Sequence, residues 1–267
     1  MLKDITLGQY FPMDSVVHRM DARFKIIITM LYLVMLFLGQ RIYCLLAGLL
    51  FTVTVTVCSK IPAKMILKSI KPIVPILMVT GLLNLLLLDG GDVLWQWKFL
   101  RITTEGIQTS VFMVVRICLL IAGTSLLTYT TSPITLTDAI EHLLSPLKKL
   151  KMPVHELAMM MTIALRFIPT LIEETDKIMA AQKARGADME SGNLLQRAHA
   201  LVPILIPLFV SAFRRAEELA LAMECRCYHG GEGRTRLRIM QSGARDYIAL
   251  SLMLLLFAAV ILLNTLM

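Results

Sequence analysis

Two short stretches of this sequence place an arginine between small residues at the end of a long helix-forming segment. The first is Ala184-Arg185-Gly186 and the second is Cys225-Arg226-Cys227. A planar guanidinium offers several donors to carboxylates and helix-end carbonyls, and small neighbours let the backbone of a partner come close. We therefore predict two docking sites for protein partners, made by these six residues. The alternative is that each arginine only neutralises the C-terminus of its own helix.

The sequence offers no set of residues for catalysis or for a resident metal. A Walker A motif needs a glycine followed by lysine, and no Gly-Lys pair occurs in the chain. The glycine-rich segment 230–236 lacks that lysine, so we interpret it as a linker after a helix. Cys225 and Cys227 lie near His229, but residues two apart on a helix point in nearly opposite directions. We predict no enzymatic activity, no cofactor and no metal site.

The composition predicts an all-α membrane protein. Hydrophobic residues make up 57% of the 267 residues, and the mean hydropathy is +0.71, which is more apolar surface than a soluble core of this size can hide. A helix needs about 20 largely apolar residues to cross a bilayer. Apolar runs of roughly this kind occur at 26–38, 42–58, 72–88, 107–128 and 247–263. We therefore expect about five transmembrane helices.

The basic residues are sorted by loop, so the net charge of +8 indicates membrane orientation and not binding to nucleic acid. Four basic residues precede the first apolar run, and the second loop contains Lys60, Lys64, Lys68 and Lys71 without an acid. The loop at 89–105 balances its basic residues with acids. We predict a multi-pass protein of the plasma membrane, with a cytoplasmic N-terminus, an external C-terminus and residues 132–245 in the cytoplasm.

The section between the fourth and fifth runs contains two long stretches with helical periodicity. The first extends from Val154 to about Lys183 and is apolar first and charged later; the second extends from about Leu194 to Cys227 after a break at 186–193. We interpret the apolar part 200–213 as a helix under the membrane domain, kinked by its prolines, and not as a sixth span.

This pattern divides the chain into three domains. Residues 1–132 hold four transmembrane helices, residues 133–242 form a cytoplasmic domain of long helices, and residues 243–267 hold the last transmembrane helix.

Arg116 is the one charge inside an otherwise apolar run. A charge in hydrocarbon is costly unless it has a partner or reaches water. Either Asn84 or a partner subunit satisfies it, or the span is shifted or tilted so that Arg116 reaches the interface or a wet cleft. The sequence leaves both alternatives open.

Several stretches together make the chain similar to one family. They are the two arginine-bearing ends, Ala164–Leu171, Arg214–Ala220, Gly8–Ser15, His18-Arg19 and Asp21–Lys25. On these stretches the chain resembles the transmembrane proteins EcfT of energy-coupling factor (ECF) transporters, the T components of the CbiQ-like family, over essentially its whole length. Many relatives have a glycine after the second arginine, where this chain has Cys227.

The resemblance implies the coupling subunit of an importer of the ATP-binding-cassette (ABC) class. Such a subunit joins two ABC ATPase subunits to a membrane-embedded S component that binds a vitamin or similar micronutrient. Arg185 and Arg226 would each dock into a groove on one ATPase, and the long cytoplasmic helices would be coupling helices. The main alternative is a T component dedicated to cobalt or nickel. A self-sufficient permease would need polar groups along its spans, and this sequence has few.

Overall fold

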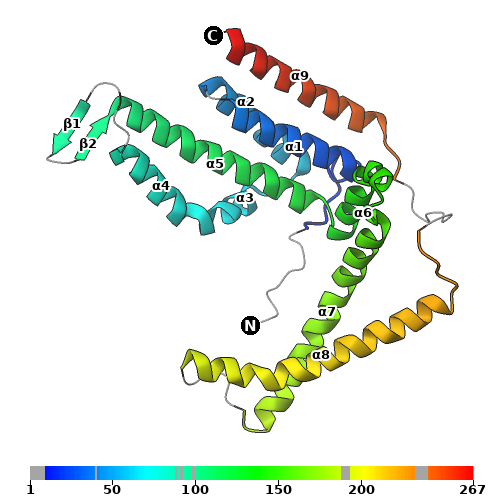
Figure 1. Cartoon of the computed structure of the whole chain (residues 1–267). Helices are drawn as coiled ribbons and strands as arrows, with labels where there is room; N and C mark the ends of the chain where they lie inside the picture. The colour runs from blue at the N-terminus through cyan, green and yellow to red at the C-terminus, as the bar shows by residue number, and fades with distance from the viewer. Residues whose placement is uncertain are drawn as a thin grey trace. The chain divides into compact units, whose positions relative to one another are not determined.

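The structure is a computed structural model that describes residues 10–39, 41–87, 90, 93–97, 100–187, 193–231 and 240–266. These residues form helices almost throughout, with one two-stranded hairpin (Figure 1). The predicted all-α membrane fold is confirmed. The chain divides into two compact units, each described by itself: a membrane unit within residues 8–136 and 239–267, and a coupling unit within residues 137–238.

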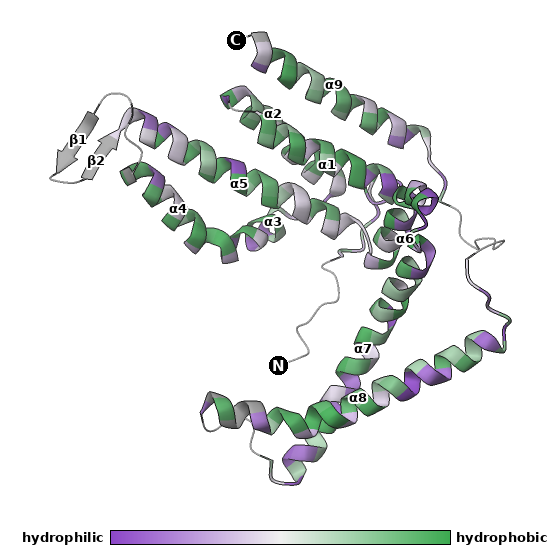
Figure 2. Ribbon diagram, viewed as in Figure 1, coloured by the Kyte–Doolittle hydropathy of each residue, from purple (hydrophilic) through white to green (hydrophobic). Residues whose placement is uncertain are grey.

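The membrane unit is built from apolar helices, which Figure 2 shows as largely hydrophobic ribbons. They are α1 (Ala22–Leu38), α2 (Ile42–Ser59), α3 (Ala63–Ile70), α4 (Val74–Leu87), α5 (Thr104–Thr130) and α9 (Ala244–Leu266), with a short 3₁₀ turn η2 (Lys71–Ile73) before α4. Each of the five apolar runs predicted from the sequence lies mainly on one of these helices. The short helix α3 was not predicted, because its eight residues make only about two turns, which is too short for a clear periodic signal.

The core of the membrane unit forms around α1. Tyr32, Met35 and Leu36 are fully buried among residues of α2, α5 and α9. The Tyr32 hydroxyl donates to the Leu119 carbonyl at 3.0 Å, so the polar end of the ring is satisfied inside apolar surroundings. A Cβ at Gly123 would lie 2.3 Å from the Tyr32 ring, so glycine is needed for this close approach.

The segment 89–105, predicted as an external loop, contains a hairpin. Its strands are β1 (Val93–Trp97) and β2 (Leu100–Thr103), paired antiparallel with Trp95 opposite Ile102 and Trp97 opposite Leu100. Aromatic and β-branched residues favour extended structure, but strands this short give little periodicity to detect in a sequence.

The coupling unit contains the two long helices predicted from the sequence. α6 (Pro133–Leu143) and the 3₁₀ turn η3 (Ser145–Leu150) lead into α7 (Val154–Ala184), and α8 (Leu194–Glu224) follows. The predicted break at 186–193 lies partly outside the described residues. α8 changes direction along its length (Figure 1), and it contains Pro203 and Pro207. The expected kinked apolar helix is therefore part of a single continuous helix.

Six helical segments of the described chain are long and apolar enough to cross a membrane. They are Ile42–Ser59, Ala63–Leu86, Thr104–Thr130, Val154–Ala184, His199–Glu224 and Ala244–Thr265. α1 is not among them because its 17 residues are one fewer than in the shortest of these segments. The set differs from the predicted five because α7 and α8 qualify through their apolar halves. Their cytoplasmic position, and the three-domain division, stay predictions.

Candidate functional site

The end of α7 is closed by a hydrogen-bonded turn with Arg185 as the C-cap residue. The Gly186 N–H donates to the Lys183 carbonyl at 3.0 Å, and the Ala187 N–H donates to the Gln182 carbonyl at 3.0 Å. Gly186 has φ +85°, in the left-handed region. These two bonds around a left-handed residue form a Schellman motif.

The end of α8 repeats this turn with a different residue in the left-handed position. The Cys227 N–H donates to the Glu224 carbonyl at 2.8 Å, and the Tyr228 N–H donates to the Met223 carbonyl at 3.1 Å. Cys227 has φ 55°, and Arg226 occupies the same place as Arg185 in α7. For a residue with a Cβ, this left-handed conformation is less stable by roughly 1–2 kcal/mol. Although the second end lacks the glycine, its hydrogen bonds give it the same geometry as the first end.

The predicted docking residues are all exposed: Ala184, Arg185, Gly186, Cys225, Arg226 and Cys227. Among the described residues, neither arginine side chain has a hydrogen bond or an ion pair. The turns already supply N–H donors to carbonyls of each helix end, so the guanidinium groups are not required for that purpose. Their donors remain available to a partner.

α7 and α8 cross each other, and polar contacts hold the crossing (Figure 1). The Glu174 carboxylate accepts a hydrogen bond from the Ser211 hydroxyl, and its other oxygen lies 3.2 and 3.3 Å from two nitrogens of Arg215. Farther along α7, the Gln182 side chain donates to the Pro203 carbonyl at 3.3 Å. Residue numbers rise on α7 as they fall on α8, so the two helices pass each other in opposite directions.

The contact between Gln182 and Pro203 follows from the proline spacing in α8. In an α-helix the carbonyl of residue 203 accepts the N–H of residue 207, but Pro207 has none. The side-chain amide of Gln182 supplies a donor to this freed carbonyl. The sequence signal was therefore a pair of prolines four residues apart, but nothing in the sequence identified the donor.

The two arginines lie at different distances from the crossing. Arg185 follows Gln182 within one helical turn, so the first end lies close to the crossing. Measured from the same contact, Arg226 lies 23 residues beyond Pro203 on α8, a helical length of about 34 Å at 1.5 Å per residue. The second end is thus the longer of two lever arms.

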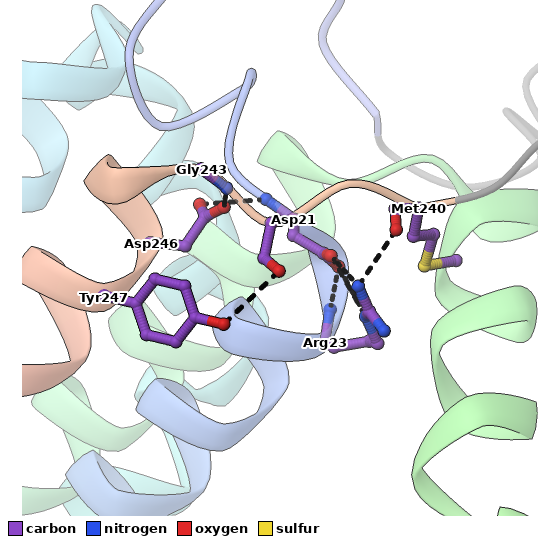
Figure 3. Close-up of polar contacts among 7 residues, drawn as sticks. Asp21, Arg23, Met240, Gly243, Asp246 and Tyr247 are labelled. Atoms are coloured by element: carbon purple, nitrogen blue, oxygen red, sulfur yellow. Dashed lines mark hydrogen bonds and ion pairs between the residues drawn. The ribbon is translucent and has the colours of Figure 1, made fainter.

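A buried charged cluster, which the sequence analysis missed, joins α9 to α1 in the membrane unit (Figure 3). Asp21 caps α1 and holds the Arg23 guanidinium at 2.5 Å. The Asp246 carboxylate accepts the N–H of Asp21 at 3.1 Å and that of Gly243 at 2.8 Å, so one side chain serves the N-terminal ends of two helices. Arg23 also donates to the Met240 carbonyl at 3.3 Å. The cluster therefore fixes the chain where it enters α9.

The segment before α1 contains a histidine held in one tautomer. His18 Nε2 lies 2.9 Å from the Phe11 carbonyl, which can only accept, so Nε2 carries the proton and Nδ1 accepts the Ser15 hydroxyl at 2.7 Å. Burial lowers the pKa of His18 below its ordinary value, and the bond to Phe11 opposes part of that effect. The neutral ring therefore orders the segment that precedes α1.

Arg116 has a partner that the sequence did not indicate. Its Nη2 donates to the Gly39 carbonyl at 2.5 Å, and its guanidinium lies 4.6 Å from the centre of the Phe112 ring. Gly39 is the C-cap of α1, so a cation meets the negative end of a helix. The contact places Arg116 beside the turn between α1 and α2.

The remaining candidates from the sequence were a metal site near Cys225 and Cys227 and the glycine-rich segment 230–236. Among the described residues, no three His, Cys, Asp or Glu side chains gather as a metal site would require. Residues 232–236 of the glycine-rich linker lie outside the described residues.

Comparison with known proteins identifies the family. Residues 13–237 match the family CbiQ, described as "Cobalt transport protein". The chain is 52% identical over 264 residues to the energy-coupling factor transporter transmembrane protein EcfT of Ruminiclostridium cellulolyticum, which covers 99% of this chain and 98% of that protein. The EcfT of Clostridium kluyveri is 54% identical over 93% of each chain, and that of Bacillus subtilis is 48% identical over 96% of this chain and 97% of its own length. The chain therefore belongs to the CbiQ family, among the transmembrane proteins EcfT of energy-coupling factor transporters.

Proposed function

We propose that this chain is the coupling subunit of an ECF-type ABC importer for a vitamin or another micronutrient. It joins two ABC ATPase subunits, which hydrolyse ATP, to a membrane-embedded S component, which binds the nutrient. Residues 1–132 and 243–267 form the membrane part, and residues 133–242 form the cytoplasmic coupling domain. The N-terminus lies in the cytoplasm and the C-terminus outside.

The observation that carries this proposal is the shared geometry of the two helix ends. Arg185 and Arg226 both occupy the C-cap of a Schellman motif, and both are exposed. Two equivalent cationic ends suit two similar partners, each offering carboxylates or helix-end carbonyls in a groove. Small neighbours on both sides of each arginine leave room for the walls of that groove.

The crossing supplies a route for motion between the ATPases and the S component. The contacts of Glu174 with Ser211 and Arg215, and of Gln182 with Pro203, hold α7 and α8 together at the crossing. Closure of the ATPase pair would displace the two arginine ends, and packed helices carry such a displacement along their length.

The apolar halves of α7 and α8 are suited to contact with a hydrophobic partner. Phe209 and Phe213 on α8 are 60% and 67% exposed, and Met160 on α7 is 54% exposed. Large exposed apolar side chains of this kind are typical of a binding surface or of contact with lipid. The S component, itself a membrane protein, would cover these side chains.

The test is to replace both arginines in the assembled transporter. We expect R185A/R226A to remain in the membrane, to lose both ATPases in an affinity pull-down, and to lose nutrient uptake. The matched control is K177A/R214A, which removes two exposed cations from the same two helices and should keep both functions. Wild-type uptake by R185A/R226A would refute the proposal.

A cobalt or nickel importer is the second candidate, because the matching family is described as a cobalt transport protein. The small hydrophobic proteins recovered in the same pull-down distinguish the two candidates by the nutrient or metal ion they bind. Transport by the purified chain alone in liposomes would instead establish a permease.

A further inference from the structure

A row of lysines lies along α3 and the first residue of η2. Lys64, Lys68 and Lys71 follow one another at intervals of four and three residues, so they share one helical face, here called the lysine face. Lys60 precedes them as the C-cap of α2. All four lysines are exposed, and no acid occurs in residues 60–71. In the part of the chain that the structure describes, none of the four forms an ion pair.

The opposite side of α3 is anchored to α5. Ile66 is 9% exposed and belongs to a buried cluster with Leu126 and Tyr129. The Ser69 hydroxyl lies 2.5 Å from the Tyr129 hydroxyl, which also donates to the Met65 carbonyl at 3.3 Å. At about 100° per residue, Ile66 and Ser69 lie across the helix from the lysine face. The anchoring therefore turns the lysine face away from α5.

The surroundings of α3 indicate a membrane surface. α3 directly follows α2 and continues through η2 into α4. α2 is apolar enough to cross a membrane, and so is the segment Ala63–Leu86, of which α3 is the N-terminal end. Leu67, beside the lysine face, is 65% exposed. An amphipathic helix with lysines and an exposed leucine next to transmembrane helices is typical of the headgroup region, where lysine stems reach toward lipid phosphates.

We propose that the lysine face is a docking surface for anionic phospholipid headgroups of the cytoplasmic leaflet. The exposed amines complement the phosphate charge, and the apolar Leu67 favours a lipid over an acidic soluble protein. Bound headgroups would hold the connection between α2 and α4, and through Tyr129 the end of α5. This proposal goes beyond the coupling function and does not depend on it.

The experiment places the full chain in nanodiscs with equal amounts of phosphatidylglycerol and phosphatidylcholine. Native mass spectrometry then counts the lipids that the released protein retains. We expect phosphatidylglycerol to be enriched about fivefold, the factor for one lysine at an anionic surface, and the enrichment to be lost in K64Q/K68Q/K71Q. The charge-retaining variant K64R/K68R/K71R should keep the enrichment. Lys60 is left unchanged because its φ of 57° lies in the left-handed region, so a substitution there would also change the stability of the backbone turn.

Unchanged enrichment in the glutamine variant would overturn the proposal. So would a glutamine variant that loses a co-purifying protein while its lipid ratio stays that of the wild type, since the surface would then bind an acidic protein.

A second measurement uses the wild-type chain and so tests the proposal even where K64Q/K68Q/K71Q fails to fold. Amine acetylation of the wild-type chain should slow at Lys64 and Lys68 in phosphatidylglycerol nanodiscs relative to phosphatidylcholine nanodiscs, with the exposed Lys177 of α7 as the internal reference. Equal acetylation rates at Lys64 and Lys68 in the two lipids would overturn the proposal.

Discussion

The ends of α7 and α8 reach the same geometry with different residues. Both place an arginine at the C-cap and close the last turn with the same two backbone hydrogen bonds. The left-handed position is Gly186 in one end and Cys227 in the other. The comparison teaches that the hydrogen bonds of the last turn determine this geometry, whereas the residue type determines how much free energy the turn costs.

The two ends also differ in reach and in chemistry. Arg185 lies next to the crossing and Arg226 lies a long way beyond it, so equal displacements at the two ends would turn the helices by different amounts. The second end has two exposed thiols, Cys225 and Cys227, and the first has none. Each difference allows the two ends to be perturbed separately.

Replacing one arginine at a time should give the largest effect. R185A removes the first docking cation and R226A the second, and loss of one partner from a charged interface pair costs roughly 2–5 kcal/mol. We therefore expect recovery of one ATPase to fall by more than about tenfold while the other is retained. Native mass spectrometry of the assembled transporter measures this stoichiometry, with R214A as the control. Loss of both ATPases from either single variant would show that the ends do not act as separate sites.

Thiol alkylation should affect the second end alone. A maleimide on Cys225 or Cys227 places bulk beside the Arg226 guanidinium, and we expect the same ATPase to be lost as in R226A. The pull-down after alkylation measures this effect. C225S/C227S serves as the control, because it keeps Arg226 and removes both thiols. Equal sensitivity of the serine variant would assign the effect to another cysteine.

Charge reversal at the crossing should weaken the contact between the two helices. E174R or R215E places like charges together and should lower stability by about 1 kcal/mol, a modest value because both side chains are partly exposed. The exchange E174R/R215E should recover part of the loss, and thermal unfolding of all variants gives the coupling energy.

The neighbouring exposed residues provide matched controls for this cycle. E173R and R214E make the same charge changes one residue away and should have little effect. A coupling energy of zero for Glu174 with Arg215 would remove the crossing contact from the proposed route of motion.

Substituting the residue in the left-handed position of each turn should give the smallest effects on stability, a loss for one turn and a gain for the other. G186A should weaken its turn by about 1 kcal/mol, and C227G should strengthen the other by a similar amount. A Cβ at Gly186 meets nothing within 4 Å, so the cost is purely conformational. Hydrogen exchange of the Ala187 and Tyr228 amides should change about fivefold, faster in the first variant and slower in the second. Changes of the same sign would contradict the shared geometry.

The sequence by itself determined the class of fold and the place of the candidate site. Apolar length and three-to-four periodicity are local properties, so the runs on α1, α2, α4, α5 and α9 and both long helices were identified within a few residues. Arg185 and Arg226 were predicted as docking residues because the same helix end occurs twice with an arginine between small residues, and this role stays a prediction. The hairpin and α3 were missed because short elements carry too few residues for a periodic signal.

Only the tertiary structure decided which groups meet. Glu174 contacts Ser211 at a separation of 37 residues, Arg116 contacts Gly39 at 77, and Asp21 contacts Asp246 at 225. The two prolines of α8 revealed a free carbonyl, but packing chose Gln182 as its donor. Helix formation depends on residues three and four apart, whereas the partner of a charge or a free carbonyl depends on which distant surfaces pack together, and a single sequence does not encode that choice locally.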